Sequence, residues 1–531
     1  MSSSSQPKAP PKSSSPSGAL WVSAGIFLSR ISGLIRQRIF AHYFGNSDAA
    51  DAFNSALKIP NFMQNLLGEG ILSASFIPVY SRFLADKHQD DADRLAGAIL
   101  GWLALIVSVI VAAGVSLTPY LIDLIAPGFE GEKRLLTIQL VKIFFPGTGL
   151  LVFSAWCLGV LNSHRKFFLS YAAPVVWNIA IIGTLIYFGP KSGESELAVY
   201  TAWGMVAGAL AQLLFQLPGT SQVIGHWRIS LSRKISSVRE VFKNFIPVVG
   251  SRGVVQVSAY IDNMLASFLP TGAVSALSYA QSLYMLPISL FGMSISAAEL
   301  PEMSRLKGSR AEIATALQSR LNRALVQVAF FIVPSVTAIL FFGDAIVGAL
   351  YQSGKFQDEE TRYVWVVLSG SMLGLLATTM GRLYSSAFYA LRDTRTPLKF
   401  ALLRVFLGTS LGYFFGLKFF PMVGMDPKWG TAALTTAAGV TGWVEFYYLR
   451  RALNREIGDS GLPMLIQLKL WGASLSIAAL VSNLRWLVPM HSPFIKLAVL
   501  CGLFGVLYLV ATAMLGFEES RKFARKIRLI K

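Results

Sequence analysis

Cysteine and charged residues are both scarce in this chain. Its two cysteines, Cys157 and Cys501, lie far apart, each within an apolar stretch, so neither a disulfide framework nor a cysteine metal site is expected. Asp, Glu, Lys and Arg make up 14% of the 531 residues, whereas hydrophobic residues make up 53%. A soluble globule of this size needs more polar surface, so the composition indicates a polytopic membrane protein.

Acidic residues are fewer than basic ones, 28 against 47, which gives a formal net charge of +19. Such a charge would suit nucleic-acid binding if the basic residues formed one compact face. They lie instead mostly in short segments between apolar runs. This distribution favours a role in membrane topology, and no nucleic-acid partner is expected.

Two further motifs are missing. Residues 1–18, MSSSSQPKAPPKSSSPSG, lack the apolar core of a signal peptide, and we interpret them as a disordered cytoplasmic tail. No Gly-x-x-x-x-Gly-Lys-Ser/Thr loop is present to bind nucleotide phosphates. We therefore expect no cofactor and no catalytic site, and expect an ion gradient or the membrane potential to drive any transport.

From about residue 19, apolar segments long enough to cross roughly 30 Å of hydrocarbon recur to the end of the chain. The pattern predicts an all-α protein with about fourteen transmembrane helices, and twelve is the main competing number. The predicted segments are 20–44, 52–83, 95–124, 134–162, 168–189, 196–218, 240–268, 273–303, 317–350, 362–390, 397–420, 428–451, 464–487 and 493–516.

Charged loops support this number, because cytoplasmic loops carry an excess of Lys and Arg. Every second loop is basic, as around Arg82, Arg165 and Arg392, while the others, such as GNSDAAD and YQSGKFQDEETR, are often acidic. The alternation predicts that both termini are cytoplasmic.

An internal repeat accompanies the alternation. GLLVFSAWCLGVLNSHRK (149–166) resembles GLLATTMGRLYSSAFYALRDTR (374–395), and FIPVYSR (76–82) corresponds to ELPEMSR (299–305) in the same order. We therefore predict two parallel six-helix lobes, a plan known in transporters. The predicted parts are an N-lobe at 19–220, a C-lobe at 221–455, a helix pair at 456–516 and a basic cytoplasmic tail at 517–531.

The first apolar segment contains Arg30, Arg36 and Arg38. For Arg38, near the helix end, snorkelling to the interface is a sufficient explanation. Arg30 and Arg36 are six residues apart, so both cannot easily reach one interface. Either they snorkel as well, or they line a water-filled cavity, because ionised groups at membrane depth cost several kcal/mol unless solvated or paired.

Other predicted helices also carry polar residues at membrane depth. The second helix contains Asp51, Lys58, Asn61 and Glu69; the seventh contains Arg252 and Asp262; and the eleventh contains Arg404. A cavity dominated by Arg and Lys favours an anion, and the planar guanidinium suits phosphate oxygens.

At these residues the chain closely resembles a known family. SRISGLIRQRIFAHYFG, then DAF, KIPN, GEG, SFIPVYS and LASFLPTGAVSALSYA resemble the MurJ/MviN family of lipid II flippases, within the multidrug/oligosaccharidyl-lipid/polysaccharide exporter superfamily. The resemblance implies a fourteen-helix fold around a cationic cavity in the bacterial inner membrane. It implies transport of undecaprenyl-pyrophosphoryl disaccharide-pentapeptide, lipid II, to the periplasmic leaflet for peptidoglycan synthesis.

The resemblance also implies roles for individual residues. Arg30 and Arg36 would face the pyrophosphate, while Asp51, Lys58, Asn61 and Glu69 would be polar residues needed for transport. The last helix pair would form a groove for the lipid tail. Membrane lipids are expected partners, and no oligomeric state is implied.

The chain departs from the family pattern at two places. It has Gln64 and Asn65 where relatives carry a basic residue, and Gln281-Ser282 where they carry Asp-Arg. Either Arg252, alone or together with Arg404, supplies replacement charge, or the substrate is held differently.

Three alternatives remain open. A flippase for another polyprenyl-pyrophosphate-linked oligosaccharide, such as O-antigen, needs the same anion site. A drug or ion antiporter would need acidic cavity groups, for which Asp262 and Glu69 are the candidates; Asp262 could also help to bind sodium or pair with Arg252. A non-transporting scaffold would not need intramembrane charges.

Overall fold

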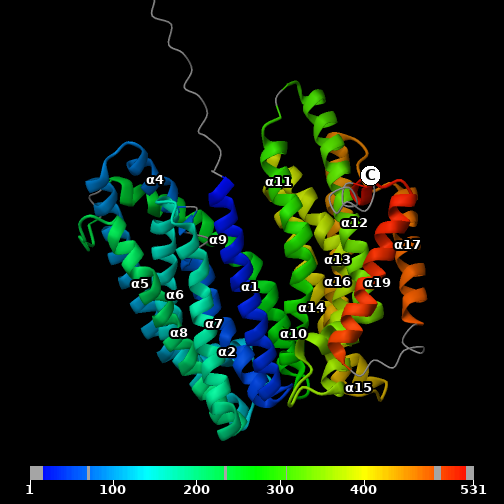
Figure 1. Cartoon of the computed structure of the whole chain (residues 1–531), viewed down its shortest axis with the longest axis horizontal. Helices are drawn as coiled ribbons and strands as arrows, with labels where there is room; N and C mark the ends of the chain where they lie inside the picture. The colour runs from blue at the N-terminus through cyan, green and yellow to red at the C-terminus, as the bar shows by residue number, and fades with distance from the viewer. Residues whose placement is uncertain are drawn as a thin grey trace, which may run out of the picture. The chain divides into compact units, whose positions relative to one another are not determined.

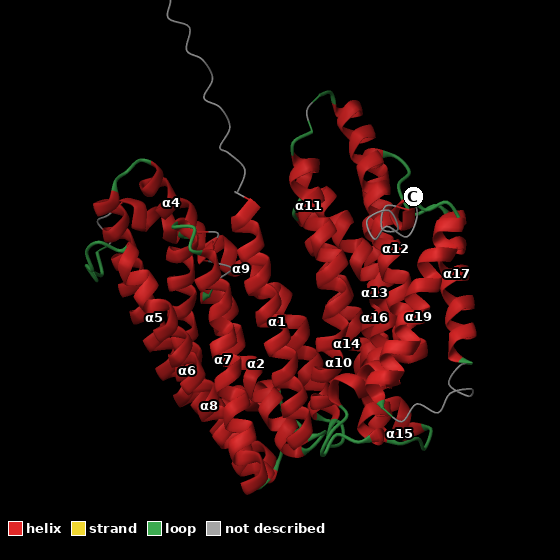
Figure 2. Cartoon of the chain, viewed as in Figure 1, coloured by secondary structure: helices red, strands yellow, loops and turns green. Residues whose placement is uncertain are grey.

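The computed structural model describes residues 16–68, 72–73, 75–232, 236–306, 308–483 and 492–521. This part of the chain is helical and contains no strand; one isolated bridge joins Ser353 and Phe356 (Figure 2). The prediction of an all-α protein is confirmed.

The helices of the first half of the chain run from blue to green in Figure 1. They are α1 (Pro16–Phe44), α2 (Asp48–Leu67), α4 (Ile77–Ala85), α5 (Gln89–Ile125), α6 (Gly131–Ser163), α7 (Phe167–Phe188), η1 (Gly189–Lys191) and α8 (Glu194–Val223).

The helices of the second half include two π-helical segments. They are α9 (Ser236–Ser267), α10 (Ala273–Pro287), η2 (Ile288–Gly292), α11 (Met293–Ser304), α12 (Arg310–Tyr351), α13 (Asp358–Ala390), α14 (Arg395–Gly412), η3 (Tyr413–Phe419), α15 (Phe420–Met422), η4 (Pro427–Trp429), α16 (Gly430–Ile457), α17 (Met464–Ser482) and α19 (Pro493–Met514).

Within the described residues, the predicted segments fall mainly on these helices; segment 52–83 covers α2 and α4, 273–303 covers α10, η2 and α11, and 397–420 covers α14, η3 and α15. Ten helices of the described chain are long and apolar enough to span a membrane. Helices α1, α2, α9 and α16 are outside that set, and all four hold charged residues. The protein is therefore a multi-pass membrane protein, while fourteen spans stay a prediction.

The described residues form two compact units. The first comprises those of Met1–Phe40, Ala56–Ile122 and Arg134–Val257, and the second those of Ala41–Ser55, Asp123–Lys133 and Ser258–Lys531. The second unit thus includes the connection from α1 to α2 and the connection from α5 to α6. The predicted lobe boundaries at residues 220 and 455 stay a prediction.

Small residues set the packing of the second unit. Helices α13 and α16 lie side by side (Figure 1), and a Cβ added at Gly374 would lie 2.4 Å from the Cα of Gly439. Only glycines allow two helix backbones to approach so closely. On the other side of α13, α12 packs against α17 and α19, where Phe342, Ala478 and Phe504 form a buried cluster.

The predicted repeat has a local counterpart in the structure. Helices α6 and α13 both end in a Schellman motif whose left-handed residue is an arginine, Arg165 with φ +60° and Arg392 with φ +63°. In each turn the arginine N–H donates to a carbonyl three residues back, and the next N–H donates to one five residues back. The two basic turns, which are predicted to be cytoplasmic, share one backbone geometry.

Candidate functional site

Arg30 and Arg36 both lie on α1 in the first unit. Arg30 is exposed, and Arg36 is half-buried, with its guanidinium over the ring of Trp177 at 4.8 Å from the centroid. Trp177 is fixed by a 3.1 Å hydrogen bond from its Nε1 to the carbonyl of Met205. A planar guanidinium stacks well on an indole while leaving its N–H edges free to donate to an anion.

One turn before Arg36, Ser32 is buried and accepts a 2.8 Å hydrogen bond from Nδ2 of Asn178. Because residues four apart share a helix face, Ser32 and Arg36 present one polar stripe of α1 to Trp177 and Asn178 of α7. Neither α7 residue was singled out from the sequence. A polar Trp-Asn pair inside the apolar run FFLSYAAPVVWNIAIIG is the signal that could have indicated them.

Lys58 and Asn61 are three residues apart and therefore share one face of α2. Lys58 is half-buried and Asn61 is exposed, both within the part of α2 that belongs to the first unit. Glu69 lies outside the described residues. The roles of Lys58, Asn61 and Glu69 stay predictions.

The two predicted residues of α9 differ in what the structure describes. Arg252 lies outside the residues whose side chains are described, so its role stays a prediction. Asp262 is half-buried in the second unit. Within the described chain, no group of three or more His, Cys, Asp or Glu residues could hold a metal ion, and sodium binding at Asp262 stays a hypothesis.

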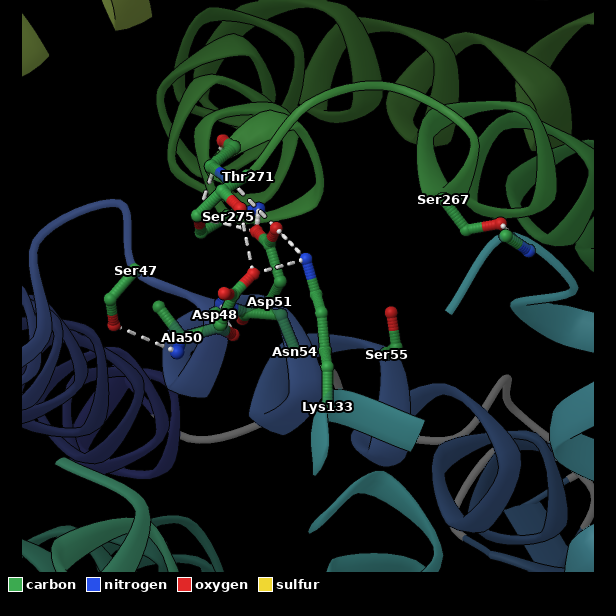
Figure 3. A network of polar contacts seen from close by, with 12 residues as sticks. Ser47, Asp48, Ala50, Asp51, Asn54, Ser55, Lys133, Ser267, Thr271 and Ser275 are labelled. Carbon is green, nitrogen blue, oxygen red and sulfur yellow. Dashed lines mark hydrogen bonds and ion pairs between the residues drawn. The ribbon is translucent and has the colours of Figure 1, made fainter. Parts of the chain in front are cut away.

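Asp51 lies at the centre of a polar network in the second unit (Figure 3). Its side chain is 1% exposed and accepts from the backbone N–H of Gly272 at 2.9 Å and from that of Ser275 at 2.8 Å. The hydroxyl of Ser275 donates to the same carboxylate at 2.7 Å. Asp51 thereby caps the first turn of α10, where free N–H groups and the helix dipole favour a negative charge.

Lys133, in the first turn of α6, supplies the opposite charge. Its Nζ lies 2.7 Å from Oδ2 of Asp51 and 2.8 Å from Oδ1 of Asp48 (Figure 3). It also lies 4.4 Å from the ring centroid of Phe129. Asp48 is the exposed member and also accepts from the hydroxyl of Thr271 at 2.8 Å. The network therefore joins the N-terminal turns of α2, α6 and α10.

Close backbone packing surrounds this network. Gly272 has φ +91°, and a Cβ there would lie 2.8 Å from the carbonyl oxygen of Asn46. Nearby, Nδ2 of buried Asn263 donates to the carbonyl of Ile125 at 3.1 Å, and the backbone N–H of Gly128 donates to the hydroxyl of Ser267 at 3.1 Å. The end of α9 is thus bonded to the connection between α5 and α6.

The sequence singled out Asp51 but not Lys133, Gly272 or Ser275. A glycine followed three residues later by serine, at the start of the predicted eighth helix, resembles a helix start and could have indicated α10 as a capped helix. The partner of that cap lies 221 residues away, so spacing could not identify it.

Comparison with known proteins places this fold in a family. The family model described as "Lipid II flippase MurJ" matches residues 40–505. The chain belongs to the MurJ family. A relative named "Probable lipid II flippase MurJ" from Rhizobium meliloti (strain 1021) is 30% identical over 488 residues, covering 90% of this chain and 88% of the relative.

Other relatives agree in length and fold. "Lipid II flippase MurJ" from Burkholderia cenocepacia is 29% identical over 94% of this chain and 97% of its own. A solved structure titled "Lipid II flippase MurJ, inward closed conformation" superposes with a TM-score of 0.76 at 24% identity, covering 96% of this chain and 99% of that one. A multidrug resistance transporter of the MATE family in its inward-facing conformation reaches 0.62 at 16% identity over 82% of this chain, which shows a shared fold only.

At the departures from the family pattern, the structure shows what the substituted residues do. Ser282 lies on α10 and donates to the carbonyl of Ser278 at 3.0 Å, and its hydroxyl also interacts with that of Tyr351. Asn65 is exposed and Gln64 half-buried on α2. None of these positions supplies a positive charge.

Proposed function

We propose that this protein moves lipid II, undecaprenyl-pyrophosphoryl disaccharide-pentapeptide, from the cytoplasmic to the periplasmic leaflet of the bacterial inner membrane. The family match across residues 40–505 carries the proposal. The relatives that cover nine-tenths of the chain are named as flippases of this substrate.

The mechanism that we propose is alternating access, with no covalent chemistry on the substrate. Arg30 and Arg36 meet the pyrophosphate, and Arg252 adds positive charge. The cation–π contact between Arg36 and Trp177 supports this role, because it restricts the guanidinium before an anion binds. Asp51, Lys58, Asn61 and Glu69 are further transport residues in this proposal.

The charges of the loops indicate how the protein is oriented in the membrane. Both termini lie in the cytoplasm, and the ion gradient or membrane potential drives transport without a bound cofactor. The basic Schellman turns at Arg165 and Arg392 support this orientation, since basic turns stay on the cytoplasmic side. A reporter that functions only in the periplasm can be fused after Lys531. Activity of that reporter would contradict the cytoplasmic C-terminus.

Complementation tests the function. In a strain depleted of its own lipid II flippase, expression of this chain should restore growth and cell shape. A strain that lacks an O-antigen flippase serves as the control for substrate. Rescue of the O-antigen strain alone would show that a different polyprenyl-pyrophosphate-linked sugar is the substrate.

A further inference from the structure

Four polar residues gather among the apolar helices of the second unit, separate from the network of Asp51. Nη1 of Arg404, near the middle of α14, lies 3.2 Å from Oε2 of Glu445, near the middle of α16. The Arg404 side chain is 31% exposed and that of Glu445 is 14% exposed. Both helices are predicted to span the membrane, which places this pair at membrane depth.

A second arginine lies close to this pair. Arg382 of α13 is near enough to both Glu445 and Tyr284 of α10 to interact with them electrostatically. Its side chain is exposed, and its guanidinium makes no hydrogen bond or ion pair with any residue that the structure describes. Tyr284 is half-buried and lies near Thr378 and both arginines.

The charges of this cluster do not balance. Two guanidinium groups face one carboxylate, and an uncompensated charge at membrane depth is expensive unless an anion or water meets it. Arginine is the residue best matched to phosphate oxygens, because its fork donates two parallel hydrogen bonds. A tyrosine hydroxyl adds a neutral donor.

We propose that Arg382, Arg404 and Tyr284 form a binding site for phosphate oxygens of the lipid-linked substrate, with Glu445 as an internal carboxylate that occupies Arg404 until the anion arrives. This inference rests on the proposed function and names the residues of the second unit that hold the substrate. Glu445 competes with phosphate for the same guanidinium, so binding stays weak enough for release.

Binding of inorganic pyrophosphate to the full chain in lipid nanodiscs, measured by calorimetry, tests the site. Arg382→Gln should weaken binding about tenfold, the effect of losing one hydrogen bond to a charged group. Glu445→Gln should strengthen binding several-fold, because Arg404 no longer has a competing anion. A purely structural ion pair predicts no gain in affinity from Glu445→Gln.

The single variant Arg404→Gln could misfold, so a double variant is used to test the role of Arg404. Arg404→Gln alone leaves Glu445 buried without its partner, whereas Arg404→Gln with Glu445→Gln removes both charges together. The double variant should bind pyrophosphate about tenfold more weakly than Glu445→Gln, again the effect of one lost charged hydrogen bond. Arg451→Gln, at an exposed arginine of α16, is the matched control and should bind like the unchanged protein.

Two results would overturn the proposal. One is that Arg382→Gln binds pyrophosphate like the unchanged protein and the double variant binds it like Glu445→Gln. The other is that Glu445→Gln shows no gain in affinity.

Failure of the proposed function gives a different result. If the chain binds pyrophosphate with the predicted pattern yet does not rescue the flippase-depleted strain, the anion site stands and lipid II is the wrong substrate. If the chain rescues growth and all variants bind equally, the site is wrong and the function stands.

Discussion

The carboxylate of Asp51 and the ammonium group of Lys133 lie 2.7 Å apart, and the same carboxylate caps the first turn of α10. A carboxylate that is 1% exposed needs such partners, since burying an ionised group alone costs several kcal/mol. The two backbone N–H groups of α10 and Lys133 together supply them. The positions of three helix starts therefore depend on one side chain.

Removing Lys133 should destabilise the protein strongly. Lys133→Met leaves the buried Asp51 charge without its cation, and breaking a buried pair typically costs about 3–5 kcal/mol. Lys133→Met with Asp51→Asn should recover part of that loss, because the amide is neutral. Thermal unfolding in nanodiscs measures the difference; if the single and double variants unfold at the same temperature, the pair is not coupled. Asp48→Asn, at the exposed member, is the control and should change little.

Gly272 should tolerate no side chain. Gly272→Ala combines a left-handed backbone, which costs about 1–2 kcal/mol for an L-residue, with a contact 2.8 Å from the Asn46 carbonyl. Gly424 has a similar φ of +70°, and nothing lies within 4 Å of the place that a Cβ would take, so Gly424→Ala should show the backbone cost alone. A larger drop in unfolding temperature for Gly272→Ala isolates the steric part. Equal drops would contradict the tight packing of this turn.

The left-handed backbone at Arg165 and Arg392 should destabilise the folded protein slightly. Arg392→Gly removes a non-glycine residue from left-handed φ and should stabilise the folded protein by about 1 kcal/mol. Arg165→Gly should do the same in the corresponding turn. Arg395→Gly, in the first turn of α14, is the control and should not stabilise. If neither glycine variant raises the unfolding temperature, the strain at these turns is relieved in another way.

Transport should depend on the positive charges of Arg30 and Arg36. Replacing either by alanine should abolish growth of the flippase-depleted strain, while lysine should keep part of it, because lysine supplies a point charge without the bidentate fork. Trp177→Leu should weaken transport by loosening Arg36, whereas Trp203→Leu, at an exposed tryptophan, should not. Normal growth of both alanine variants at normal protein levels would show that the two arginines only snorkel.

The helices could be predicted from the sequence because each apolar run is long enough to cross the membrane and ends at a charged or glycine-containing turn. Within the described residues, the predicted segments fall mainly on helices for that reason. The sequence does not predict the π-helical turns at Ile288–Gly292 and Tyr413–Phe419, since an extra residue in one turn leaves no mark on an apolar pattern.

The partners of polar side chains are the part that sequence could not provide. Lys133 is 82 residues from Asp51, and only the fold decides which helix starts meet. Glu445 does not stand out because it is a single acidic residue in the predicted segment 428–451, which ends in Arg450 and Arg451. Its pairing with Arg404 depends on the packing of α14 against α16. The sequence does indicate Arg36 correctly as a polar group inside a helix, but not its stack on Trp177.

Transport by the purified protein tests the central claim most directly. The chain is reconstituted into liposomes that carry fluorescent lipid II in the inner leaflet under an imposed ion gradient, and the rate at which the label becomes accessible outside is measured. The account predicts faster exposure than in protein-free liposomes, and loss of that gain when Arg30→Ala and Arg36→Ala are combined. Exposure no faster than in protein-free liposomes, or an equal rate in the double variant, would contradict it.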